Sequence, residues 1–232
     1  MRFNFFDFSN IPSPYFRKIG ICFHIGLRYV RSRPDLVLIL ALVGILGAFG
    51  MNFPVINALM ATTEFHAGPG EFGLLGSIMA VGTLAGALLA ARRARPRLRY
   101  LLGGALGLGI FTVAASVAPS FWVYTAVLVP VGLASITFLN SCNTSIQLSV
   151  EPQFRGRVLA LYLAILQGGT AVGSPLIGWI GSEFGARWSV AVGGLVVLLA
   201  GLGAVIVVSR RSRLTLRRAF RVAFSGKREA AA

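Results

Sequence analysis

Six long runs of the chain contain no Asp, Glu, Lys, Arg or His. They cover residues 36–59, 72–91, 101–117, 121–150, 158–180 and 189–208. A helix needs about 20 predominantly apolar residues, with a lower limit of about 17, to cross the hydrocarbon core of a bilayer. Every run meets that requirement. The pattern therefore predicts an all-α integral membrane protein with six transmembrane helices.

The basic residues fall on alternate sides of these runs. Of the 22 Lys and Arg, all but Arg187 lie before the first run, between the second and third, between the fourth and fifth, or after the sixth. Because cytoplasmic loops are enriched in Lys and Arg, we expect both termini in the cytoplasm. This divides the chain into a cytoplasmic segment, 1–34, a six-span domain, 35–208, and a basic cytoplasmic tail, 209–232.

Two flanking segments have the spacing of helices that lie in the headgroup layer. Their apolar faces are Phe16, Ile19, Phe23, Leu27 and Val30 before the first run, and Leu216, Phe220 and Phe224 after the last, each opposite basic residues. Orientation and anchoring of the chain is one interpretation, and binding of anionic lipid is the other.

Composition excludes several other classes of protein. Apolar residues make up 56% of the chain and charged residues 12%, against about 25% charged in soluble proteins. The net charge of +15 comes from clusters between apolar runs, so we expect the lipid bilayer as a partner and no nucleic acid. The two cysteines and two histidines stand apart, so we expect no disulfide framework, no metal, no cofactor and no enzyme activity.

The apolar runs carry amide and hydroxyl side chains, which seek hydrogen-bond partners in hydrocarbon. They are candidates to line a substrate pathway: Asn52 and Asn57 in the first run, Asn140, Thr144 and Gln147 in the fourth, and Gln167, Thr170 and Ser174 in the fifth. Hydrogen bonding between helices explains the same groups equally well. The runs contain no ionisable relay of the kind used for ion coupling.

The second and fifth runs share a spacing of small residues. Gly82, Thr83 and Gly86 match Gly169, Thr170 and Gly173, in helices that cross the membrane in opposite senses. This predicts a three-plus-three inverted repeat. The glycines at which a neighbouring backbone could approach are Gly82, Gly86, Gly169, Gly173 and Gly178, and we expect them to form a seam with another helix bundle.

Four segments carry a resemblance to a known family. They are GLRYVRSRPDL at 26–36, FGMNFPV at 49–55, NTSIQLSVEPQFRGRVLALY at 143–162 and GGTAVGSPLIGWIGSEFG at 168–185. From about residue 23 to 208 the chain resembles the carboxy-terminal six-helix half of a major facilitator superfamily transporter. Within that superfamily it is similar to the group of the bacterial enterobactin exporter and related transmembrane secretion effectors.

The resemblance implies secondary active transport in the bacterial inner membrane, with export of a small organic molecule by alternating access. The substrate site would lie between two six-helix halves near the midplane. Arg155, Gly156 and Arg157 would form a loop at the cytoplasmic gate. The second and fifth helices would form the seam with a second half, or with a second copy in a homodimer.

The chain departs from the family in two ways. Its loop at 92–99, RRARPRLR, has neither the Asp nor the Gly of the superfamily's cytoplasmic motif, so the gating contacts of that motif do not carry over. The family has twelve spans where this chain has six, which fits a truncated gene product or a half-transporter that needs a partner. The alternative function is that of a non-transporting half or remnant that acts only in membrane assembly.

Overall fold

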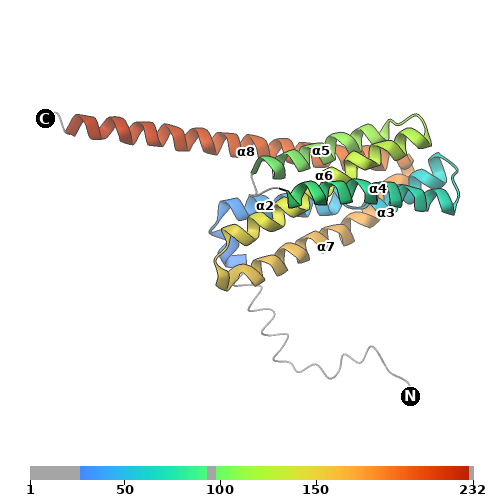
Figure 1. Cartoon of the computed structure of the whole chain (residues 1–232), viewed down its shortest axis with the longest axis horizontal. Coiled ribbons are helices and arrows are strands. Elements are labelled where there is room, and N and C mark those ends of the chain that lie inside the picture. Colours follow the sequence, from blue (N-terminus) through green and yellow to red (C-terminus); the bar gives the residue numbers. More distant parts are fainter. Residues whose placement is uncertain (1–26, 93–97, 230–232) are drawn as a thin grey trace, which may run out of the picture.

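The chain forms a bundle of long helices with roughly parallel axes, and the end of the last helix projects beyond the others (Figure 1). The computed structural model describes residues 27–92 and 98–229, with side chains as far as Arg210. Its elements are α2 (Pro34–Gly50), α3 (Phe53–Leu59), the π-helical η2 (Met60–Glu64), α4 (Pro69–Ala91), α5 (Leu98–Ser116), α6 (Phe121–Ser149), α7 (Pro152–Phe184) and α8 (Ala186–Glu229). Within the described residues six spans are long and apolar enough to cross a membrane, which confirms the predicted fold class.

The first span is divided into two helices. Between α2 and α3 the chain leaves helical geometry at Met51 and Asn52, just before Pro54 in the first turn of α3. Proline has no N–H to donate and its ring clashes with the carbonyl four residues earlier, so it is tolerated at the start of a helix and interrupts its interior. The break therefore follows from the position of Pro54 in an otherwise continuous apolar run.

The fifth span is longer than the predicted 158–180, because α7 begins at Pro152. Proline in the first turn has the backbone angle of a helix already set, and Glu151 provides the N-cap. The prediction that Arg155, Gly156 and Arg157 form a loop is therefore wrong: all three lie in the first turns of α7.

At its other end, α7 is joined to α8 through Gly185 alone, which has a φ of 97°. Glycine adopts this left-handed backbone without the steric cost that a Cβ would bring. A reversal of direction between two long helices is thereby made in a single residue.

The two predicted interfacial helices lie largely outside what the structure describes. Most of the apolar face of the first falls in residues 1–26, and the face with Leu216, Phe220 and Phe224 lies beyond the described side chains. The backbone shows that α8 continues past the predicted end of the sixth span at 208, as far as Glu229. The tail thus starts as a direct continuation of the last membrane helix.

The close helix contacts depend on glycines of α4 and α7. A Cβ on Gly82 would overlap the carbonyl oxygen of Val129 in α6, and one on Gly173 would overlap the carbonyl oxygen of Ala48 in α2. Without side chains at these points the two backbones touch, and van der Waals packing of this kind drives association of membrane helices. The neighbouring glycines repeat the pattern, since Gly86 meets Leu133 and Ile136 of α6, and Gly169 meets Gly44 and Ala48 of α2.

These contacts are reciprocal between the two groups of three spans. In the first group, the second span α4 packs on α6, the span that begins the second group. In the second group, the middle span α7 packs on α2, the span that begins the first group. The third spans of both groups, α5 and α8, pack on each other through Gly109 and Gly194. Each close contact made by one group thus has an equivalent in the other, as expected of two repeats related by a pseudo-two-fold axis.

The structure therefore corrects the predicted partner of the glycine seam. Gly82, Gly86, Gly169 and Gly173 face helices of the same chain and are not available to a second bundle. A Cβ on Gly178 would lie 3.8 Å from Cγ1 of Val55, an ordinary contact, so that glycine marks no close approach. Spacing indicated that a backbone comes near, but the neighbour is α2 or α6.

Replacement of Gly173 by Leu is expected to destabilise the bundle, because it forces α7 away from α2. Overpacking typically costs about 1–3 kcal/mol. The matched control is Gly168→Leu on the same helix, where a Cβ would meet nothing within 4 Å. Thermal unfolding of both variants in the same detergent measures the difference, and equal unfolding temperatures would contradict the proposed contact.

Candidate functional site

Three of the predicted polar residues meet at the break in the first span. The Oγ of Ser174 donates a hydrogen bond of 2.6 Å to Oδ1 of Asn52, and Nδ2 of Asn52 donates one of 2.5 Å to the carbonyl of Ala48. The Oγ1 of Thr170 lies 3.2 Å from the carbonyl oxygen of Gly47 and 3.0 Å from that of Leu166. Asn52 is only 1% exposed.

The chemistry of a helix end explains this cluster. The last four carbonyls of a helix have no intrahelical donor, and at membrane depth no water replaces it. Gly47 and Ala48 are among the last four residues of α2, and Thr170 and Asn52 supply the missing donors. The cluster thus stabilises the break and joins it to α7.

A second buried hydrogen bond ties α3 to α6. The hydroxyl of Tyr124 donates to Oδ1 of Asn57 at 2.9 Å, and both residues are buried. Tyr124 was not among the candidates, because nothing in its sequence neighbourhood distinguishes it from an aromatic anchor. For Asn52, Asn57, Thr170 and Ser174 the geometry favours the reading that they join helices.

The remaining candidates have a different environment. Asn140 is half-buried, and Thr144, Gln147 and Gln167 are exposed on α6 and α7. Thr144 donates to the carbonyl of Asn140 at 2.7 Å and Gln147 to Oδ1 of Asn143 at 2.7 Å, so both bonds stay within α6. Amide and hydroxyl groups left accessible in this way are available to a molecule outside the six-helix bundle.

Two of the distinctive sequence segments contact each other at one end of the bundle. The Nη2 of Arg33, which precedes α2, donates to the carbonyl of Ser149 at the end of α6 at 2.7 Å. The rings of Tyr29 and Phe154 stack with centroids 4.7 Å apart, and the guanidinium of Arg157 lies 5.8 Å from the centroid of Phe154. The turn between α6 and α7 is thus braced against the start of the first span.

Sequence reasoning did not identify Arg33, Tyr29 and Phe154 as a unit. Each stands within a segment that carries the family resemblance, at 26–36 or 143–162. No spacing within either segment indicates that the other segment is its neighbour. Arg155 and Gly156 are exposed at the same end.

At the opposite end an ion pair connects η2 to the start of α8. The Nε of Arg187 lies 2.6 Å from Oε1 of Glu64, with the two side chains 38% and 31% exposed. Partly exposed pairs of this kind contribute about 1 kcal/mol or less. Arg187, the one basic residue that departs from the charge pattern of the loops, therefore has a carboxylate as its structural partner.

The helices α4 and α7 are the least covered of the six spans. In the most apolar stretch of each, 17% of residues in α4 and 22% in α7 are buried, against 56% in the first span and 50% in α6. Their exposed large side chains include Val81, Leu84, Leu88, Val172, Leu176 and Trp179. One side of each helix packs inside the bundle, and the rest is free for lipid or protein.

The described residues contain no group of three or more His, Cys, Asp or Glu that could hold a metal ion.

Comparison with known proteins agrees with the fold. Residues 11–218 match the sequence model of a family described as transmembrane secretion effector. No curated protein matches the chain. The matched region covers all six spans and most of the chain. The chain therefore belongs to the transmembrane secretion effector family, a transporter family of the major facilitator type.

Proposed function

We propose that this chain is one six-helix half of a secondary active transporter that exports a small organic molecule by alternating access. The observation that carries the proposal is the exposure of α4 and α7, the second helices of the two repeats, in a bundle whose other helices are better covered. Such a face is suited to a second six-helix unit, and the substrate site would lie between the two units.

The polar side chains not buried in the bundle support the same proposal. Asn140, Thr144 and Gln147 on α6 and Gln167 on α7 would contact the substrate, while the buried cluster around Asn52 would hold the helices that carry them. Arg155 and Arg157 would act at the cytoplasmic gate from the first turns of α7. The membrane would be the bacterial inner membrane, with both termini in the cytoplasm.

The first test concerns topology. A reporter enzyme that is active only outside the cytoplasmic membrane is expected to be inactive when fused after residue 97 or at the carboxy terminus, because the arginine-rich loops stay inside. The same reporter fused at Ser120, between α5 and α6, is expected to be active. Strong activity at the carboxy terminus would overturn the proposed orientation.

The second test concerns the proposed seam with a second bundle, formed by the exposed side chains of α4 and α7. With Cys22 and Cys142 replaced by Ala, single cysteines at Val81 or Val172 are expected to cross-link to a neighbouring bundle in native membranes. The matched controls are cysteines at Ile110 on α5 and Leu199 on α8, which are equally exposed. Cross-linking should be several-fold stronger at the first pair, and equal yields at all four positions would exclude this seam.

The third test concerns transport itself. In an efflux-deficient bacterium the chain, alone or with a second six-helix half, is expected to lower the accumulation of at least one of a panel of fluorescent organic dyes. Gln147→Leu or Gln167→Leu should slow export about tenfold, the effect of one lost hydrogen bond of about 1.4 kcal/mol.

The control for transport is Gln153→Leu, which changes an exposed glutamine bonded to Glu151 outside the proposed pathway. It should leave export unchanged. Accumulation that stays the same in every combination would instead support a non-transporting assembly partner.

A further inference from the structure

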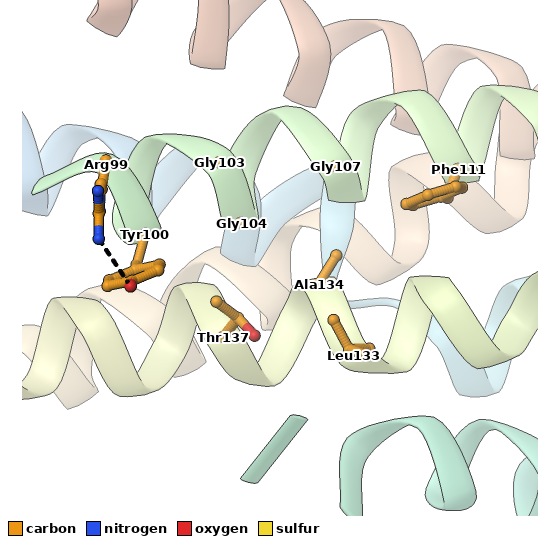
Figure 2. Close-up of a pocket in the computed structure, with 9 residues that line it drawn as sticks. All are labelled: Arg99, Tyr100, Gly103, Gly104, Gly107, Phe111, Leu133, Ala134 and Thr137. Carbon is orange, nitrogen blue, oxygen red and sulfur yellow. Dashed lines mark hydrogen bonds between the residues drawn. The ribbon is translucent and has the colours of Figure 1, made fainter. Parts of the chain in front are cut away.

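An elongated hollow lies on the surface between α5 and α6, away from the helices assigned to the seam. It has a volume of about 170 Å³, and glycines 103, 104 and 107 of α5 form one wall. Figure 2 shows Arg99 and Tyr100 at one end of the hollow, Phe111 at the other, and Leu133, Ala134 and Thr137 on the facing side of α6. The hollow is thus apolar along its length and charged at one end.

The length of the hollow matches one leaflet of a bilayer. From Arg99 to Phe111 the helix rises roughly 18 Å at 1.5 Å per residue, and half of the hydrocarbon core is about 15 Å. Arg99 lies in the first turn of α5, at the start of the third candidate membrane span. The charged end therefore lies at headgroup depth and the apolar end near the midplane.

Arg99 is held where it can bind an anion. Its guanidinium donates from Nη2 to the hydroxyl of Tyr100 at 3.1 Å and lies 4.9 Å from the centroid of that ring. A guanidinium has five N–H donors, so others remain for a phosphate. Arginine also matches phosphate geometry with paired hydrogen bonds.

Thr137 provides a second, independent indication of a ligand. It is 7% exposed, it lines the hollow, and its Oγ1 has no hydrogen-bond partner among the described residues. A buried hydroxyl without a partner is costly. Because Gly104 packs against Phe138, Thr137 lies near the level of Gly104, roughly 7 Å deeper than Arg99 by helix rise. That is the depth of the ester groups of a phospholipid whose phosphate lies at Arg99.

We infer that this hollow is a binding site for one anionic phospholipid of the bilayer. Arg99 binds the phosphate, the hydroxyl of Thr137 donates to an ester carbonyl, and an acyl chain lies along the glycine wall towards Phe111. The positive charge of Arg99 favours an anionic headgroup over a zwitterionic one. The inference uses only α5 and α6, so it stands or fails independently of transport.

The test is lipid retention by the purified chain. Native mass spectrometry after equal exposure to phosphatidylglycerol and phosphatidylcholine of the same acyl composition should show about tenfold preference for phosphatidylglycerol, the effect of about 1.4 kcal/mol. Arg99→Gln should remove that preference. Gly103→Leu should reduce retention of both lipids, because its side chain would enter the hollow, where a Cβ on Gly103 meets nothing within 4 Å.

Matched variants separate this site from diffuse effects. Arg92→Gln removes an exposed arginine at the end of α4, and Gly76→Leu adds a side chain to an open position on α4; both should retain lipid as the wild type does. The unfolding temperature of each variant shows whether the bundle is intact. Gly103→Ala, which has a smaller side chain than Gly103→Leu, is measured in the same way.

Several results would overturn the inference. These are equal retention of the two lipids, equal effects of Arg92→Gln and Arg99→Gln, or no effect of Gly103→Leu. Thermal stabilisation by inorganic phosphate as large as that by phosphatidylglycerol would indicate a simple anion site. A change of oligomeric state in Gly103→Leu without a change in lipid retention would make the hollow a protein contact.

Discussion

Direct contact between helix backbones is the interaction on which the rest of this structure depends. Hydrocarbon supplies no hydrophobic force between helices, so close van der Waals packing must supply the attraction. Gly82 brings α4 onto α6, and Gly173 brings α7 onto α2. Only at that separation does Ser174 reach Asn52 across the helix interface. The polar cluster at the break therefore depends on glycines, which have no side chain and so let the helices come this close.

Much of the fold could be predicted from the sequence because a bilayer imposes strong limits on it. Runs without charge indicated the six spans, and the spacing of Gly82, Gly86, Gly169 and Gly173 indicated an inverted repeat and close backbone contacts. The predicted neighbour, a second helix bundle, was wrong, because a small residue shows that a backbone can approach but does not show which one. The start of α7 differs from the prediction as well, because Pro152 begins a helix where Arg155 and Arg157 interrupt the apolar pattern.

The candidate site was predictable as a set of residues but not as a set of contacts. Asn52, Thr170 and Ser174 were all candidates; the structure joins Asn52 and Thr170 to carbonyls at the end of α2, and Ser174 to the side chain of Asn52. Whether an amide faces a neighbouring helix or the exterior depends on helix rotation, which spacing alone does not give. The contact of Arg33 with Ser149 could not be predicted either, because it depends on two segments far apart in the chain.

The exchange of partners between the repeats has a consequence for biosynthesis. A nascent chain that has inserted α2, α4 and α5 holds three helices whose closest partners have not yet been synthesised, because α4 awaits α6, α2 awaits α7 and α5 awaits α8. The first three spans therefore cannot complete their tight packing as a separate unit. Assembly in the membrane has to wait until the sixth span arrives, and the order of translation does not give the order of folding.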